Sequence, residues 1–327
     1  MRQYFVTQKL IKLVPKVGGE LIIEPQYGYC GCIVFDNGKR TFYKESCLDI
    51  NTQGAVRIAI DKGYSNYFLQ HFGFLVPAFD TFVNEELNRH LKIEKGIQEG
   101  YLYALELGFP VIIKPNAGAK GKHIYKINNK EAYFESAKKL FVDSKIMMVQ
   151  QFAKGNDFRI VVFDGKVYCA YQRLPLQVIG NGEADVRTLL KQRSNELKGI
   201  TTFSINDQRI RAKLAELNLS YNDILPKGVK VVLLNIANLS LGGKAIDFTD
   251  KISAEYKALA IGITQKMGLR LCGIDLMTDS ITGKVNDYSI IEINSAPGYS
   301  NFALLGEPQS KIIDGLYLDM LRSIKNY

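Results

Sequence analysis

The sequence predicts a mixed α+β protein with about two domains. Its 327 residues are about twice the size of an average domain. With 46% hydrophobic and 23% charged residues, the composition is that of a folded globular chain. From residue 110 to residue 152, apolar runs typical of strands flank a glycine-rich loop and a helical pattern. The resulting order of strand, loop, strand, helix and strand predicts an α+β lobe.

The first fifty residues predict a short β-rich segment. Brief apolar runs alternate there with turn signals, and Asn37-Gly38 is typical of a hairpin turn. Helical spacing follows from Ala55 to Phe72 and ends at Gly73.

The rest of the chain alternates predicted strands and helices. The expected strands cover residues 110–114, 123–127, 146–152, 157–163, 166–173, 229–234, 271–277 and 288–294. Asp164-Gly165 predicts a hairpin turn between two of them. The expected helices cover residues 130–142, 207–217 and 253–267, with two more beginning near Asp185 and Gln309.

Several classes of protein are disfavoured by simple patterns. No apolar run reaches the roughly 20 residues that a membrane span needs. Lys9 and Lys12 interrupt the position where a signal peptide has its apolar core, so we expect a cytoplasmic protein. The five cysteines are scattered and odd in number, which fits a reducing compartment.

The net charge of +9 is concentrated in one region. Residues 111–145 hold eight lysines and three acidic residues, and these lysines surround a glycine-rich turn. Because no platform of aromatic residues is interleaved with them, a small polyanion fits better than a nucleic acid. A solvated lysine face explains the same composition equally well.

The glycine-rich stretch NAGAKGKH begins at Asn116. Backbone amides freed by glycine, with lysines beside them, can hold phosphate oxygens. The stretch is not a Walker A loop, because it joins two predicted strands and lacks the following Ser or Thr and helix. An ordinary exposed hairpin remains the alternative.

Two predicted strands near the C-terminus carry a stronger signal. Asp275 lies in LCGIDLM, and Glu292 and Asn294 lie in YSIIEIN, each on the face opposite the apolar side chains. If the strands pair, these three side chains converge on the face away from the core. Hard oxygen ligands of this kind suit Mg²⁺. A solvated sheet face is the alternative.

Together these features resemble the ATP-grasp superfamily. The resemblance rests on Lys114 at the end of a strand, the glycine-rich hairpin, the segment IMMVQQFAKGNDFRIVVF and the GIDLM and EINSAPG pair, in that order. The segments RLPLQVIGNGEADVRTLL and ANLSLGGKAIDFTD are similar to the ATP-grasp region of cyanophycin synthetases and bifunctional glutathione synthetases. The resemblance covers residues 60–327 and implies an ATP-grasp fold, two α+β lobes clasping ATP, after the short β-rich N-terminal segment.

The resemblance also implies roles for particular residues. It assigns Asp275, Glu292 and Asn294 to magnesium. It assigns catalytic roles near the reacting phosphates or phosphoryl group to Arg159, Arg173 and Asn238. It assigns nucleotide binding to Lys62, Lys114, Gly118, Lys120, Gly121, Lys122, Gln150, Gln151, Phe152, Ala153 and Asp157.

The sequence departs from this family at two places. Gln150 stands where glutamate is usual, and this difference affects how the nucleotide base would be recognised. Leu234 and Asn235 stand where an arginine is expected in cyanophycin-like sequences, so Arg209, Arg211 or Lys244 is left to stabilise the transferring phosphate.

The predicted function is an ATP-dependent carboxylate-amine ligase that uses ATP and Mg²⁺. The expected substrate is a small amino acid or peptide, with no nucleic acid or membrane partner, and a homo-oligomer is left open. The expected segments are residues 1–75, a small ATP-grasp lobe over 76–153 and a large lobe over 154–327. The alternatives are a nucleotide-binding module without ligase activity and a basic nucleic-acid-binding protein.

Overall fold

The chain forms two compact units in a computed structural model that describes residues 4–118, 123–197, 203–234, 237 and 239–326. Unit 1 comprises residues 1–77, 153–171 and 247–327, and unit 2 comprises residues 78–152 and 172–246. Both units are discontinuous in sequence, whereas the sequence pattern predicts three consecutive segments. That assignment of segments stays a prediction.

Unit 1 begins with a helix and a four-stranded antiparallel sheet of order β1-β2-β3-β4. Its first elements are α1 (Phe5–Leu13), η1 (Val14–Val17), β1 (Gly19–Ile23), β2 (Cys30–Phe35), β3 (Arg40–Lys44) and β4 (Cys47–Leu48). The predicted hairpin at Asn37-Gly38 is confirmed, since β2 pairs with β3 and Gly38 has a φ of +83°. Helix α1 was not predicted, although Val6, Leu10 and Leu13 are buried along one face.

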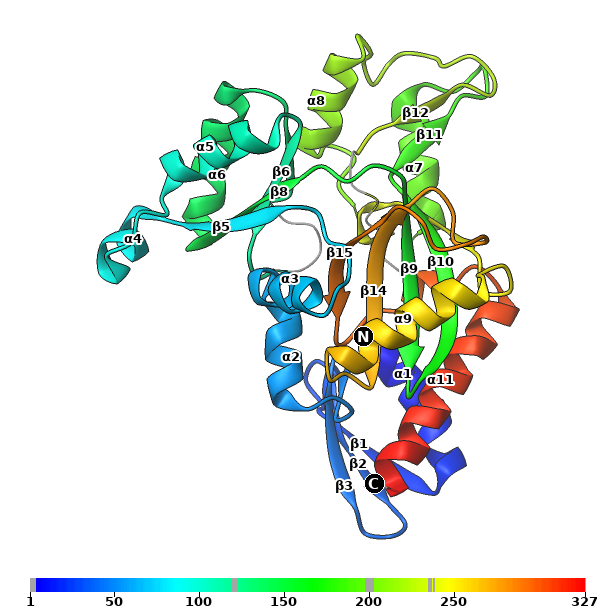
Figure 1. Cartoon of the computed structure of the whole chain (residues 1–327). Helices are drawn as coiled ribbons and strands as arrows, with labels where there is room; N and C mark the ends of the chain where they lie inside the picture. The colour runs from blue at the N-terminus through cyan, green and yellow to red at the C-terminus, as the bar shows by residue number, and fades with distance from the viewer. Residues whose placement is uncertain (1–3, 119–122, 198–202, 235–236, 238, 327) are drawn as a thin grey trace. The chain divides into compact units, whose positions relative to one another are not determined.

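A five-stranded sheet has the order β13-β10-β9-β14-β15, and its strands β9, β14 and β15 lie wholly within unit 1. Its strands are β9 (Asn156–Phe163), β10 (Lys166–Leu174), β13 (Lys244–Asp247), β14 (Leu271–Thr278) and β15 (Tyr288–Asn294). The predicted turn between β9 and β10 is confirmed, with φ of 45° at Asp164 and 74° at Gly165, as a tight hairpin requires. Helix α9 (Ala254–Lys266) crosses one face of this sheet (Figure 1) and buries Tyr256 and Ile263.

Helix α9 begins where its sequence predicts, because Ser253 caps it by accepting a hydrogen bond from the Tyr256 amide. The remaining helices of unit 1 are α2 (Gln53–Ile60), α3 (Lys62–His71), α10 (Ser300–Ala303) and α11 (Glu307–Asn326). The predicted helix over 55–72 is therefore two helices, because Asp61 has extended backbone and caps α3.

Unit 2 contains a four-stranded sheet of order β5-β8-β6-β7 and a two-stranded sheet of β11 and β12. The predicted pairing across the glycine-rich loop is confirmed, since Val111 lies opposite Ile127 in antiparallel strands. The elements are β5 (Phe79–Val83), α4 (Glu85–Leu91), α5 (Ile97–Leu107), β6 (Val111–Pro115), β7 (Tyr125–Ile127), α6 (Lys130–Asp143), β8 (Ile146–Gln151), β11 (Gln177–Ile179), α7 (Val186–Glu196), α8 (Gln208–Glu216), β12 (Lys230–Val232) and η2 (Leu239–Leu241).

Among the described residues, every helix is too short or too polar to cross a bilayer.

Candidate functional site

The carboxylates of Asp275 and Glu292 and the amide of Asn294 come together in unit 1, as predicted. Asp275 lies opposite Glu292 in the ladder of β14 and β15, and Asn294 lies opposite Gly273. Asn294 Nδ2 is 3.5 Å from Asp275 Oδ2 and 3.3 Å from Glu292 Oε1. We call these three residues the oxygen cluster.

The oxygen cluster is less exposed than the strand pattern predicts, because Arg159 of β9 lies against it. Arg159 is the ladder partner of Asp275 and binds it through two parallel hydrogen bonds of 2.6 Å, from Nε to Oδ1 and from Nη2 to Oδ2. Asp275 is consequently only 1% exposed. Burial of Arg159 opposes its charge, but the charge and hydrogen bonds of Asp275 outweigh burial and raise the pKa of Arg159 well above its ordinary value.

Lys62 adds a second cation to this group. It is the first residue of α3, which Asp61 caps through the Tyr64 amide. Lys62 Nζ lies 3.5 Å from Glu292 Oε2, and Lys62 is 7% exposed. Two carboxylates and two cations therefore lie within one region of unit 1.

The donor atoms of the oxygen cluster suit a hard cation. Glu292 is the accessible member, since 30% of its side chain is exposed and its contacts with Lys62 and Asn294 are long. A half-turn of the Asn294 amide exchanges its nitrogen for an oxygen ligand. The described residues contain no group of three or more His, Cys, Asp or Glu that could hold a metal, so a magnesium site here would use the amide as its third donor.

Lys114 and Gln150 form a buried pair in unit 2. They lie on β6 and β8, and Lys114 Nζ donates to Gln150 Oε1 at 2.8 Å. The two residues are 3% and 2% exposed. Because an ammonium has no acceptor atom, it fixes the amide orientation, and Gln150 Nε2 is left buried without a hydrogen-bond partner among the described residues. Such a donor favours a ligand that brings an acceptor atom.

The other predicted site residues lie on strands β8, β9 and β10 or in loops. Gln151 ends β8 and is exposed, and the ring of Phe152 lies 4.2 Å below the ammonium of Lys126. Asp157 lies on β9 opposite Met277, and Arg173 lies on β10. Gly118 and Ala153 lie in loop segments. The predicted residues that lie outside the described part of the chain are Lys120, Gly121, Lys122 and Asn238.

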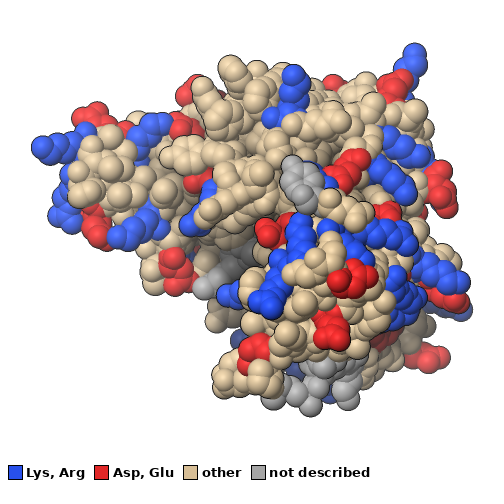
Figure 2. All heavy atoms as spheres, turned by 90° about the horizontal axis from the view of Figure 1, so that it is seen from below, with Lys and Arg blue, Asp and Glu red and all other residues tan. Residues whose placement is uncertain are grey.

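The lysines of residues 111–145 do not all serve one site. Lys114 is buried, whereas Lys139 pairs with Glu135 and Lys145 with Glu86 at the surface. Mixed charge is also visible on the face drawn in Figure 2, where acidic side chains lie among the basic ones.

Arg193 of α7 has a structural role that was not predicted from the sequence. It donates from Nε to the Gly242 carbonyl at 3.1 Å and from Nη2 to the Gly243 carbonyl at 2.7 Å. Gly242 has a φ of +94°, and a Cβ there would lie 2.9 Å from the Phe203 ring. Arg193 thus holds the glycine turn of the NLSLGG segment, from 49 residues away in sequence. No local pattern could have revealed this contact. Of the arginines proposed to replace the missing one, Arg209 is paired with Asp207 at 2.7 Å.

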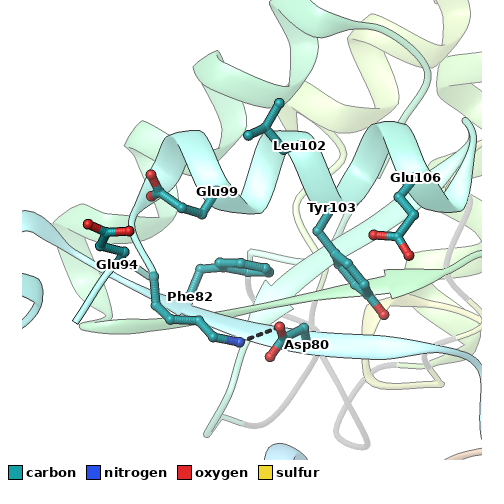
Figure 3. A pocket seen from close by; sticks show the side chains of 8 residues that line it. Asp80, Phe82, Glu94, Glu99, Leu102, Tyr103 and Glu106 are labelled. Atoms are coloured by element: carbon teal, nitrogen blue, oxygen red, sulfur yellow. Dashed lines mark hydrogen bonds and ion pairs between the residues drawn. The ribbon is translucent and has the colours of Figure 1, made fainter.

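An acid-rich pocket of about 330 Å³ also lies in unit 2 (Figure 3). Lys95 is one of the residues that line it, and it pairs with Asp80 and lies over the Phe82 ring. The other lining residues are Glu94, Glu99, Leu102, Tyr103 and Glu106. With four acids and one lysine, this pocket does not suit an anionic ligand.

Comparisons with known proteins agree with the sequence resemblance. Residues 235–314 match the RimK-like ATP-grasp domain. Cyanophycin synthetase of Nostoc sp. is 31% identical over 227 residues, which cover 65% of this chain and 25% of that protein. The glutathione biosynthesis bifunctional protein GshAB of Streptococcus mutans is 26% identical over 276 residues, which cover 80% of this chain and 35% of that protein.

A solved structure extends the match to almost the whole chain. The bifunctional glutathione synthetase of Pasteurella multocida aligns with 97% of this chain and 44% of its own, at a TM-score of 0.63 and 21% identity. This likeness concerns the fold. The chain spans about a quarter to a third of the curated relatives it matches.

Proposed function

We propose, from the premise that this chain carries a RimK-like ATP-grasp domain, that it is an ADP-forming ATP-dependent carboxylate-amine ligase. In this reaction ATP phosphorylates a substrate carboxylate, and an amine then attacks the acyl phosphate to form an amide. The substrate class is an amino acid or a short peptide, in line with the names of the relatives.

The observation that carries this proposal is the oxygen cluster with its two cations. Asp275, Glu292 and Asn294 would hold Mg²⁺, which supplies charge neutralisation at phosphate oxygens. Arg159 and Lys62 add positive charge beside these ligands. Positioning and charge neutralisation carry phosphoryl transfer, so these residue types are sufficient without a nucleophilic side chain.

The Lys114 and Gln150 pair supports a contact with the nucleotide in unit 2. Both side chains are buried donors, and Gln150 Nε2 gains a partner when a ligand oxygen or ring nitrogen reaches it. The described histidines do not offer a hydrolytic alternative: His123, for example, contacts Tyr125 and Asp143 rather than a nucleophile.

The decisive experiment measures ADP release with Mg-ATP against a panel of amino acids and short peptides. Glu292→Gln should abolish turnover while some nucleotide binding remains, because it removes the accessible charged ligand. Glu20→Gln, on the exposed face of β1, is the matched control and should keep full activity. An unaffected rate in Glu292→Gln would contradict the metal assignment.

The intermediate gives an independent test. Hydroxylamine should replace the amine and trap the activated carboxylate as a hydroxamate, with ADP and phosphate as the other products. AMP and pyrophosphate would instead refute the mechanism. A wild type that binds ATP and never releases ADP with any member of the panel would favour the nucleotide-binding module.

A further inference from the structure

Strand β12 (Lys230–Val232) has an open edge. Its one neighbour among the described strands is β11, beside which it lies in Figure 1. At the two ends of this ladder the Gly180 amide donates to the Val229 carbonyl, and the Leu233 amide donates to the Leu176 carbonyl. Because backbone groups alternate in direction along a strand, the amides and carbonyls of Lys230 and Val232 point away from β11.

An apolar groove of about 540 Å³ follows this open edge. Its walls are Lys213, Leu217, Leu219, Leu225, Pro226 and the four residues 229–232. Both odd and even residues of the strand line it, whereas β11 contributes none, so the groove runs along the edge of β12 rather than over one face of the sheet.

The side chains of the groove combine apolar surface with positive charge. Leu217 is 41% exposed, Val229 is 42% exposed and Val232 is 37% exposed. Among the described residues, Lys213 and Lys230 are the charged ones that line the groove, and none of the lining residues is acidic. Lys213 pairs with Glu216, while Lys230 is exposed and has no ion pair within the described part of the chain. The groove therefore complements an apolar segment that carries a carboxylate.

We propose that β12 is a docking edge for an extended acidic peptide. The peptide adds to the β11–β12 sheet as a third strand, with backbone hydrogen bonds to Lys230 and Val232. Its apolar side chains contact Leu217 and Val229, and a carboxylate contacts the Lys230 ammonium. Alternate side chains of one short strand can make both kinds of contact, because they point to opposite faces. This surface does not depend on the nucleotide chemistry proposed above.

The test uses fluorescence anisotropy with two labelled hexapeptides, one alternating valine with glutamate and the other valine with lysine. The acidic peptide should bind at micromolar concentration and the basic one at least about tenfold more weakly. Val232→Pro removes an amide that points away from β11, so it leaves the β11 ladder intact and should weaken the acidic peptide about tenfold. Ile179→Pro is the matched control, because Ile179 is opposite Lys230 and its amide points to the other edge of the sheet.

Charge reversal separates recognition from folding. Lys230→Glu should weaken the acidic peptide and strengthen the basic one, whereas Lys227→Glu, outside the groove, should change neither by more than about twofold. The proposal is overturned if the acidic peptide does not bind at about 1 mM, or if it binds Val232→Pro and Lys230→Glu as well as the wild type. It is equally overturned if sedimentation shows that Val232→Pro only dissociates a dimer, because the edge then serves a second copy of the chain.

Discussion

The buried pair of Arg159 and Asp275 concentrates opposite charges at one point of the five-stranded sheet. Two hydrogen bonds of 2.6 Å join the side chains directly across β9 and β14. Each side chain compensates the burial of the other, so the loss of one partner leaves a buried charge without its counter-ion.

Arg159→Met should therefore lower the free energy of unfolding by about 3–5 kcal/mol. Adding Asp275→Met should recover part of this loss, since no buried carboxylate remains. Arg270→Met breaks the more exposed pair with Asp164 and should cost about 1 kcal/mol or less. Urea denaturation of the wild type and the three variants measures these differences. Equal losses for Arg159→Met and Arg270→Met would show that the buried pair is worth no more than the exposed one.

The Asp314 carboxylate lies in unit 1, and we expect it to make the free energy of unfolding decrease at acid pH. Burial raises its pKa, but hydrogen bonds and charges from Lys12 and Lys9 outweigh burial, and its pKa lies below the ordinary value. The contribution to stability is therefore complete above the unfolded-state pKa of about 3.9 and is lost as the pH falls through the lower folded-state pKa.

Asp314→Asn should accordingly reduce stability at neutral pH and flatten the dependence of the melting temperature on pH between about 4 and 2. Asp49→Asn, at an exposed position, is the matched control variant. If the melting temperature of Asp314→Asn still falls steeply between about pH 4 and 2, other carboxylates cause this pH dependence.

At the scale of elements, two glycines should respond oppositely to alanine. Gly155, before β9, has a φ of +108°, and a Cβ there would lie 2.9 to 3.0 Å from the backbone of Thr278. Gly262 lies inside α9, where an added Cβ would meet nothing within 4 Å. Gly155→Ala should destabilise by more than about 1 kcal/mol, whereas Gly262→Ala should stabilise by up to about 1 kcal/mol through helix propensity. Thermal denaturation compares them, and equal shifts would contradict this assignment.

Sequence patterns predicted elements well where local signals agree. The turn at Asp164-Gly165 is confirmed, and the three helices predicted to begin at or near Asp185, Asp207 and Ser253 begin directly after these residues, which cap them. Helix α5 was not predicted, and it contains Gly100, a residue that disfavours helices. The structure explains this glycine, because a Cβ there would lie 2.4 Å from the Tyr133 hydroxyl. Tertiary packing, which the local pattern does not contain, selected that residue.

In the candidate site, too, local patterns predicted some contacts, and others depend on the tertiary fold. The alternation of side chains between the two faces predicted that Asp275 and Glu292 converge if their strands pair. The irregularity of the ladder between Asp275 and Leu276 was not predicted, because no local pattern marks a bulge there. The contact of Arg159 with Asp275 spans 116 residues and depends on the order of the five-stranded sheet, which periodicity does not determine. The roles implied by the family resemblance stay predictions.

For the whole molecule, we expect Mg-ATP to stabilise the folded chain. At about 100 times its dissociation constant, a ligand of the native state adds about 2.7 kcal/mol. Lys114→Ala should weaken the resulting shift in melting temperature, whereas Lys138→Ala, at an exposed position of α6, should leave it intact. No shift of the wild type with millimolar Mg-ATP would count against nucleotide binding.

Because unit 1 is built from three separate segments of the sequence, it can complete its folding only after the last of them has been synthesised. Arg159 emerges 116 residues before Asp275, and Lys9 emerges 305 residues before Asp314. Strand β9 can pair early with β10, but its other neighbour, β14, is made much later, as is α11, which packs against α1. Both segments of unit 2, residues 78–152 and 172–246, are made before β14 and α11. Contacts this distant in sequence form slowly, and the waiting apolar surfaces are exposed to aggregation. The nascent chain is therefore expected to need protection by chaperones until β14, β15 and α11 have been made.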